Sequence, residues 1–255
     1  MTTIRMDNVR VINVPVSRLT GAEIVETIIQ WTAVRGTRVA VGVNAAVCNL
    51  AATDRGFRKV LRGADLRYPD GQSIVWASRL LGAGLPERIA TTDLINPLAA
   101  VAAERGKRIF LYGSKPGVAA RAAARLREAN PGLVIDGRAG YTAPGEVLQV
   151  IDEINAFKPD LLFVGLGDPM QQYWIEAHRH QLNAHVILTC GGLFDWASGD
   201  NRRAPRWMLS SGLEWLWRLM LEPRRLASRY LIGNPAFILR LARQLLRRRT
   251  RVILP

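Results

Sequence analysis

The first candidate for chemistry is an acidic residue in a proline–glycine turn. The segment Tyr68-Pro-Asp-Gly-Gln72 places Asp70 directly before a helical segment rich in Ile, Val, Trp and Ala. Aspartate at such a point commonly caps a helix. It also suits a general base that takes a proton from a substrate hydroxyl as the hydroxyl attacks. Asn44, which ends an apolar strand pattern, is likewise either a turn former or a hydrogen-bonding partner for a substrate. The residues alone leave these alternatives open.

Glycines end four of the predicted strands, at Gly113, Gly165, Gly192 and the segment 137–140. In open α/β sheets, ligands bind outside the carboxyl ends of the strands, where glycine lets backbone amides approach an anion. The pattern therefore indicates a nucleotide or sugar-phosphate site. The alternative is that each glycine only allows a tight turn between a strand and a helix.

Specific nucleotide and metal signatures are absent from the sequence. The segment 165–170 lacks the third glycine of a dinucleotide fingerprint, and no Gly-Lys-Ser/Thr phosphate loop or Asp-x-Asp pair occurs. His178, His180 and His185 lack a convincing ligand set, because residues two apart on a helix point to different sides. We therefore expect no bound metal and no cofactor.

The elements that must position these residues alternate between two patterns. Short apolar runs rich in β-branched residues are followed by segments of helical periodicity, which is typical of βαβ units on a mainly parallel sheet. The predicted strands cover residues 38–44, 108–113, 133–136, 160–167 and 185–192. The predicted helices cover residues 72–81, 92–105, 116–129, 146–157 and 169–179.

Charge divides the chain into two parts. The 255 residues carry a formal charge of +14, but residues 1–200 contribute only +3 of it. Residues 201–255 contribute +11, from 13 arginines against two glutamates. We therefore predict a body over residues 1–199 and a basic helical appendage over residues 200–255.

Three helices are expected in the appendage, over residues 205–221, 223–231 and 235–249, with Pro223 and Pro235 as helix starters. In the last of them, one arc gathers the apolar residues and another gathers the arginines. The apolar residues are Phe237, Ile238, Leu241 and Leu245, and the arginines are Arg240, Arg243 and Arg247.

Such a basic amphipathic appendage has three interpretations. It suits an anionic membrane surface, with Trp207, Trp215 and Trp217 at the interface. It also suits a nucleic-acid-binding arm, which would make the protein a basic nucleic-acid-binding protein with an α/β nucleotide-binding body. The third interpretation is a solvated cationic helix surface.

The longest runs without formal charge are about 15 residues, below the roughly 18 to 20 that span a bilayer. No secretory signal precedes the body, so a cytoplasmic protein is expected.

Several short motifs occur in a fixed order and together resemble one family. They are Pro69-Asp-Gly71, Pro86-Glu-Arg88 with Thr92-Asp-Leu94, Gly165-Leu-Gly-Asp-Pro-Met-Gln171, Gly191-Gly-Leu-Phe-Asp195, Arg203-Ala-Pro205, Glu214-Trp-Leu-Trp-Arg-Leu219 and Glu222-Pro-Arg-Arg225. The ordered set, from about residue 10 to 235, resembles the TagA/WecG/CpsF glycosyltransferases, often called glycosyltransferase family 26.

The resemblance implies a Rossmann-like α/β fold and a metal-independent, inverting hexosyltransferase. A sugar would pass from a nucleotide donor, usually UDP-linked, to a polyprenyl-diphosphate-linked sugar in bacterial cell-envelope synthesis, such as teichoic acid or exopolysaccharide. The enzyme would lie peripherally on the inner face of the cell membrane, its appendage on anionic lipid. A homo-oligomer stays open, and nucleic acid is not an expected partner.

The resemblance also assigns site residues. Asp70 matches the proposed base, Asn44 and Gln171 match polar active-site positions, and Arg218 and Arg225 match appendage arginines that hold the diphosphate. The expected substrate-binding residues are Gly113, Gly140, Tyr141, Gly165, Gly167, Pro169, Gly191, Gly192, Phe194, Asp195 and Arg203.

Four positions depart from the family pattern. Where the family usually has threonine, this chain has Gly42, and where the family often has glycine, it has Thr91. The family usually has glutamate at the position of Gln172 and often has arginine at the position of Ser228, which here precedes Arg229. We expect these departures to affect donor or acceptor identity, or the level of activity, more than the reaction class.

Overall fold

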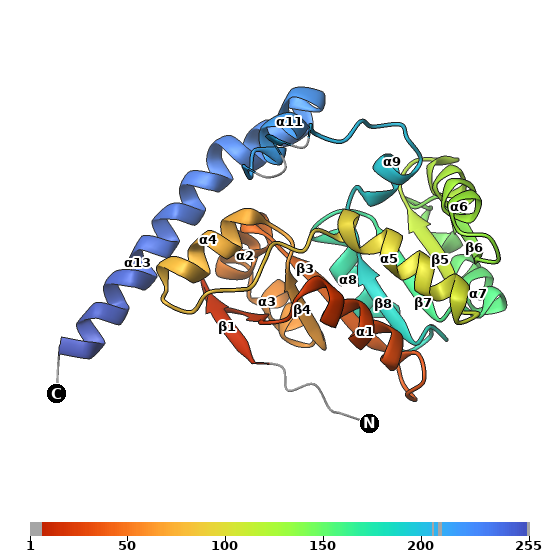
Figure 1. The fold of residues 1–255 in the computed structure, drawn as a ribbon, viewed down its shortest axis with the longest axis horizontal. Helices are drawn as coiled ribbons and strands as arrows, with labels where there is room; N and C mark the ends of the chain where they lie inside the picture. Colours follow the sequence, from red (N-terminus) through yellow and green to blue (C-terminus); the bar gives the residue numbers. More distant parts are fainter. Residues whose placement is uncertain (1–6, 206, 209–210, 254–255) are drawn as a thin grey trace.

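The central element of the body is a six-stranded sheet in which every neighbouring pair is parallel, in the order β4-β3-β8-β7-β5-β6 (Figure 1). This computed structural model describes residues 7–205, 207–208 and 211–253. The strands are β3 (Arg38–Val43), β4 (Leu66–Pro69), β5 (Arg108–Gly113), β6 (Val134–Arg138), β7 (Leu161–Gly165) and β8 (Val186–Thr189). The predicted α/β class with a mainly parallel sheet is confirmed.

Helices cover both faces of the sheet, so the central strands are apolar on both sides. All five residues of β7 are buried, as expected for a strand covered from above and below. One face packs against α1 (Gly21–Trp31), α5 (Thr91–Glu104), α6 (Val118–Ala129) and α9 (Leu193–Ala197). The other packs against α2 (Ala45–Thr53), α3 (Arg55–Arg62), α4 (Gln72–Leu80), α7 (Val147–Phe157) and α8 (Met170–His178), and a short 3-10 turn, η1 (Pro144–Glu146), precedes α7.

Several elements were not predicted from the sequence. Besides α1, α2, α3 and α9, they are β4 and an antiparallel hairpin of β1 (Asn8–Val11) and β2 (Val14–Ser17). The hairpin turn uses Ile12 and Asn13 at φ of 47° and 66°, a conformation usually signalled by glycine. The strand β4 is short and ends in Pro69, which weakens its pattern.

The appendage differs from prediction at two points. The segment expected as one helix over residues 205–221 is interrupted by a turn at residues 211–213, with Gly212 at φ of 74°, and α11 (Glu214–Leu221) begins after it. Pro223 does begin α12 (Pro223–Ala227), but Pro235 does not begin a helix. A π-helical turn, η2 (Ser228–Ile232), instead leads directly into α13 (Gly233–Ile253). Pro235 is the third residue of α13, just after the π-helical turn.

The long helix α13 lies along one end of the body (Figure 1). Phe237 and Leu241 are buried in the same cluster as the side chains of α2, and Leu245 packs against it. Ile238, at the edge of that apolar arc, is 64% exposed, so only part of the arc packs against the body. Within the described residues, none of the helices combines the length and apolar character that crossing a bilayer requires.

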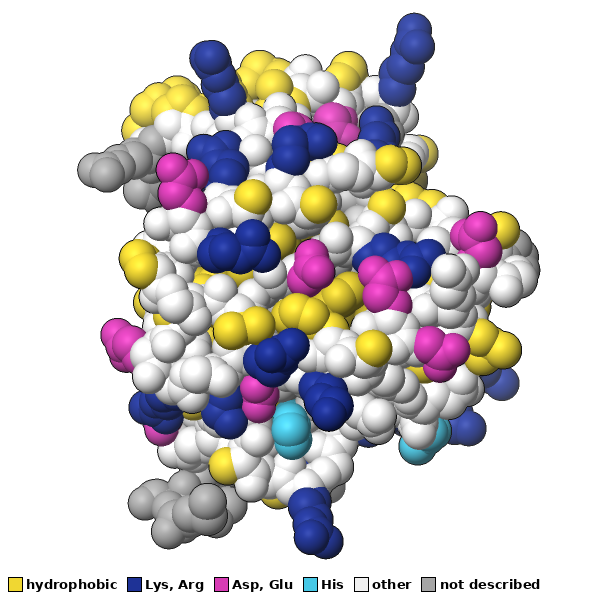
Figure 2. Space-filling view, turned by 90° about the vertical axis from the view of Figure 1, so that its right-hand side faces the viewer, with side chains coloured by type: hydrophobic (Ala, Val, Ile, Leu, Met, Phe, Trp, Pro, Cys, Tyr) yellow, Lys and Arg dark blue, Asp and Glu magenta, His cyan; other side chains and the backbone are white. Residues whose placement is uncertain are grey.

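The face on the side away from α13 is mixed in charge. Figure 2 shows Lys and Arg interspersed there with Asp and Glu, and with scattered apolar side chains. This mixture of charges is consistent with the near-neutral body expected from the sequence. The excess of arginine lies in the appendage, and the proposed division at residue 199 follows from that charge alone.

Candidate active site

The predicted site residues converge at the carboxyl edge of the sheet. Because all six strands are parallel, the loops that follow them emerge at the same edge. Asn44 follows β3, Asp70 follows β4, Gly191 follows β8, and Gly167 follows β7. Residues from well-separated parts of the chain are thus brought to one edge, with α11 and η2 of the appendage beside them.

Asp70 does not cap α4, the helix that follows it. The N-cap of α4 is Gly71, without a side-chain cap, and the Asp70 carboxylate instead accepts a hydrogen bond from the Thr91 backbone N–H at 3.1 Å. Burial raises the pKa of Asp70, while the Thr91 N–H and the positive charges of Arg218 and Arg88 act in the opposite direction. The negative charge of Glu214 adds to the upward shift. A carboxyl group surrounded in this way is suited to proton transfer.

The space around Asp70 depends on Gly42. A Cβ at Gly42 would lie 3.0 Å from the Asp70 Cβ and 3.3 Å from the Thr91 hydroxyl oxygen. That hydroxyl also contacts the buried Tyr68 hydroxyl at 2.8 Å. Asp70 is therefore held between β3 and the start of α5 with little room for movement.

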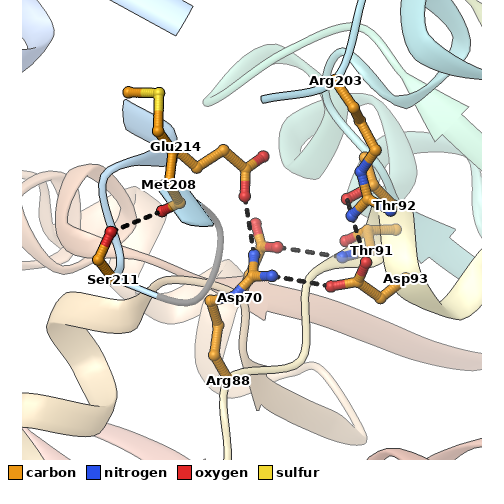
Figure 3. Close-up of polar contacts among 9 residues, drawn as sticks. All are labelled: Asp70, Arg88, Thr91, Thr92, Asp93, Arg203, Met208, Ser211 and Glu214. Carbon is orange, nitrogen blue, oxygen red and sulfur yellow. Dashed lines mark hydrogen bonds and ion pairs between the residues drawn. The ribbon is translucent and has the colours of Figure 1, made fainter. Parts of the chain in front are cut away.

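An ion-pair network joins the appendage to the body beside Asp70 (Figure 3). Arg88 donates to Glu214 of α11 at 2.9 Å and to Asp93 of α5 at 3.0 Å. Arg203 also pairs with Asp93 and contacts the Thr92 hydroxyl. Arg88 and Glu214 side chains are 17% and 18% exposed, so this pair is shielded from water more than ordinary surface pairs.

Arg218 faces the same edge of the sheet from α11. Its guanidinium lies 5.6 Å from the centre of the Trp196 ring, and its Nη2 would be 3.4 Å from a Cβ at Gly192. Its Nε is buried without a hydrogen-bond partner among the described residues. A partly buried arginine with an unused, buried Nε beside a glycine loop is suited to an anionic ligand.

Arg225 stands in α12, but its side chain lies outside the described part of the structure, so its role stays a prediction. Arg229, not predicted as a site residue, comes from the π-helical turn η2. It donates to the Asn44 side-chain oxygen at 3.3 Å and lies 3.7 Å from Asp168. The turn thus directs an appendage arginine to the ends of β3 and β7.

Asn44 and Gln171 have structural contacts of their own. Asn44 caps α2, where its side-chain oxygen accepts from the N–H groups of Ala46 and Val47. Gln171 is buried; it donates to Asp168 at 2.8 Å and accepts from the Gly191 N–H at 3.0 Å. Gln171 therefore joins the loops after β7 and β8.

Apart from Gly192, which faces Arg218, the predicted glycines divide into two groups. Gly113, Gly140 and Gly165 allow backbones to pack, because a Cβ at any of them would come within 3.0 Å of a neighbouring residue. These three support the tight-turn interpretation. Gly167 and Gly191 have φ of 80° and 53° and face open space, because a Cβ at either would have no neighbouring atom within 4 Å. They are the glycines at which a ligand could approach the backbone.

The remaining predicted residues have distinct positions. Tyr141 is 59% exposed, and its hydroxyl donates to the Leu166 carbonyl. Asp195 accepts from the Ser114 hydroxyl at 3.0 Å, and Pro169 is the N-cap of α8. Phe194 is fully buried against Gly165, so the structure places it in the core and not on a substrate-facing surface.

Sequence reasoning did not assign roles to Arg88, Asp168, Glu214 or Arg229. Arg88, Asp168 and Glu214 lie within motifs that the sequence showed, and that was the available signal. For Arg229, the only signal in the sequence was its position next to Ser228, where the family often has an arginine. The described residues contain no group of three or more His, Cys, Asp or Glu side chains placed to hold a metal ion.

Comparison with known proteins places these residues in a family. Residues 9–251 match the model of the glycosyl transferase WecG/TagA/CpsF family. A Bacillus subtilis protein named N-acetylglucosaminyldiphosphoundecaprenol N-acetyl-beta-D-mannosaminyltransferase is 37% identical over 72% of this chain and 71% of its own. A Staphylococcus aureus protein of the same name is 29% identical over 80% of this chain and 79% of its own. The chain belongs to the WecG/TagA/CpsF family of glycosyltransferases.

Proposed function

We propose that the protein transfers N-acetylmannosamine from a UDP-linked donor to the N-acetylglucosamine of a polyprenyl-diphosphate acceptor. The names of the relatives supply the sugar and the acceptor. One observation carries the proposal: the Asp70 carboxyl and the Arg218 guanidinium both lie at the carboxyl edge of the sheet, where the charge of Arg218 opposes the rise that burial causes in the pKa of Asp70. A base for the attacking hydroxyl and a cation for the leaving diphosphate are thus available for one displacement reaction.

In the proposed mechanism, Asp70 accepts the proton of the attacking acceptor hydroxyl. The hydroxyl oxygen forms a bond to the anomeric carbon as the bond from that carbon to the UDP oxygen breaks, and UDP leaves with its electron pair. Attack on the face opposite the leaving group inverts the anomeric configuration. The Thr91 N–H fixes one oxygen of Asp70 and leaves the other for the proton.

Negative charge develops on the departing diphosphate, and arginines supply the compensating charge in this proposal. Arg218 is placed for that role by its buried Nε without a partner and its position beside Gly192. Arg225 is proposed for the same role on the family resemblance. No step of the proposed mechanism requires a metal ion.

For the donor, the open backbone at Gly167 is proposed to offer its N–H to a phosphate oxygen. Gly191 leaves room for the donor beside it, because its own N–H already donates to Gln171. Tyr141, exposed beside the Leu166 carbonyl, is proposed to stack on the uracil ring. Asp195 is held by Ser114 at the end of β5, where it could accept from a donor hydroxyl.

The acceptor lipid places the reaction at a membrane surface. We propose peripheral association through the appendage, whose exposed apolar side chains include Trp207, Met220, Leu221, Leu231 and Ile232. These side chains lie in the same segment as the excess of arginine, a combination suited to anionic lipid.

Mass spectrometry of transfer reactions tests the proposed function. A panel of UDP- and GDP-linked sugars is incubated with short-chain polyprenyl-diphosphate N-acetylglucosamine. We expect a disaccharide product from UDP-N-acetylmannosamine, with β configuration by NMR. Transfer of a different sugar from the panel would correct the donor, and an α-linked product would contradict inversion.

A further inference from the structure

A groove lined by arginines lies outside the candidate active site, between α13 and the β1–β2 hairpin. Its volume is about 770 Å³. It is lined by Arg10, Ile12, Asn13, Ala52, Arg240, Arg243, Gln244, Arg247 and Arg248, and none of these side chains is acidic. Arg10 and α13 are thus far apart in the chain and adjacent in space.

The two walls of the groove are held together by Gln244. Its side-chain oxygen accepts from the Ile12 N–H at 2.7 Å, and its Nε2 donates to the Arg10 carbonyl at 2.9 Å. Both bonds join a side chain of α13 to the backbone of the hairpin turn. The position of Arg10 relative to the arginines of α13 is therefore defined by the fold.

Four of the five arginines of the groove form no ion pair with an acidic side chain of the described residues. Arg240 donates to the Asn49 side-chain oxygen at 2.6 Å, and Arg248 donates to the Leu81 carbonyl at 2.7 Å, so both bind neutral acceptors. Of the ion pairs formed among the described residues, none includes Arg10, Arg240, Arg243 or Arg248. Like charges gathered in one groove favour the binding of an anion.

Apolar side chains continue from the groove along the outer side of α13. Leu239 and Leu246 are 52% and 63% exposed, and they stand four residues before and three residues after Arg243. At these spacings, the three side chains share one helix face. An arginine flanked by exposed leucines fits a phosphate that is attached to acyl chains better than a free phosphate.

We propose that this groove binds the phosphate of an anionic phospholipid headgroup, with Leu239 and Leu246 in contact with the acyl region. The N-terminal hairpin and the C-terminal helix then form one lipid site, separate from the candidate active site that contains Asp70. The site extends the proposed function, because it would hold the enzyme on the surface that carries its acceptor.

Vesicle flotation tests the site with the full chain and without any sugar substrate. The variant Arg10→Gln/Arg243→Gln is compared with Arg35→Gln/Lys158→Gln, which removes the same charge from two exposed residues outside the groove. Vesicles contain phosphatidylcholine with or without phosphatidylglycerol. An arginine near an anionic leaflet contributes about 1 kcal/mol, so we expect roughly 25-fold weaker binding for the groove variant.

Control variants and competing ligands decide the outcome. We expect the remote variant to lose less than about threefold, and Arg10→Lys, which keeps the charge, to bind as the wild type does. Equal losses for the groove and remote variants would overturn the proposal. So would binding of inorganic phosphate at the groove without any preference for phosphatidylglycerol, or tighter binding of single-stranded RNA that depends on Arg10 and Arg243.

Transfer to a short-chain acceptor in detergent separates this proposal from the proposed function. The groove variant should keep wild-type transfer in detergent, since neither residue lies at the carboxyl edge of the sheet. Absence of transfer by the wild type would contradict the proposed function. A groove variant with a normal transfer rate and unaltered vesicle binding would contradict the proposed lipid site.

Discussion

The guanidinium of Arg88 lies 2.9 Å from the carboxylate of Glu214, and this ion pair connects the body to α11 of the appendage. Both residues also act on the pKa of Asp70, in opposite directions. The position of the appendage and the protonation of the candidate base are therefore coupled through one contact.

Removing the charge of Glu214 should shift the pH dependence of transfer. Glu214 raises the pKa of Asp70, so Glu214→Gln lowers it and makes the ionised base available at lower pH. The acidic limb of kcat/KM should move to lower pH. Glu104→Gln, at an exposed position of α5, is the matched control and should leave the limb in place. A limb that stays fixed or moves to higher pH in Glu214→Gln would contradict the coupling.

The departures at Gly42 and Thr91 should compensate each other. A Cβ at Gly42 would lie 3.3 Å from the Thr91 hydroxyl oxygen and 3.0 Å from the Asp70 Cβ. Gly42→Thr alone should therefore destabilise the protein by about 1–3 kcal/mol through overpacking. Adding Thr91→Gly removes the contact with the Thr91 hydroxyl and leaves the one with Asp70, so it should recover part of the lost stability.

Denaturant unfolding of both single variants and the double variant measures this coupling. We expect the double variant to be more stable than the sum of the single effects by about 0.5–3 kcal/mol. Additive effects on the free energy of unfolding would show that the two positions are independent, which would contradict the proposed contact between them.

The sequence predicts the central sheet better than the site. The strand β7 could be predicted because its residues form a continuous apolar run with no helical period, and all five are buried in the structure. Glycine at strand ends was also evident, but only the packing shows that Gly165 makes room for the Gly191 carbonyl while Gly167 faces open space. A single sequence does not report which backbone atoms approach a glycine.

Contacts between distant segments were the part that sequence could not supply. From the sequence, Asp70 was more suited to capping the following helix than to catalysis. The structure decides against capping of α4, because the Asp70 carboxylate accepts from the Thr91 N–H at the start of α5. Arg229 enters the site because η2 is a π-helical turn, and its side-chain direction cannot be read from a regular helical period.

Arg218 should be needed for the chemical step. If it meets the charge of the leaving diphosphate, Arg218→Ala should lower kcat about 10² to 10³-fold, and Arg218→Lys should recover part of the loss. Arg224→Ala, an exposed arginine of the same appendage, is the control and should stay within about twofold of wild type. Equal losses in the Arg218 and Arg224 variants would indicate a general effect of charge.

Asp70 should be unfavourable for stability at neutral pH. Because burial raises its folded-state pKa above the unfolded value, the ionised carboxylate destabilises the fold above the folded pKa, and this cost disappears as the pH falls below the unfolded value. Asp70→Asn should therefore raise the midpoint of thermal unfolding at pH 7 and have little effect below the unfolded pKa, about 3.9. A lower midpoint at pH 7 would show that the ionised carboxylate is stabilising instead.

The most direct test of the proposed mechanism is the rate of transfer by Asp70→Asn with UDP-N-acetylmannosamine and the short-chain acceptor, at saturating substrate. UDP binding by calorimetry should remain near that of the wild type. We predict a fall in kcat on the order of 10² to 10⁴-fold, the usual contribution of a general base. A rate near wild type in this folded variant would contradict the assignment of Asp70 as the base.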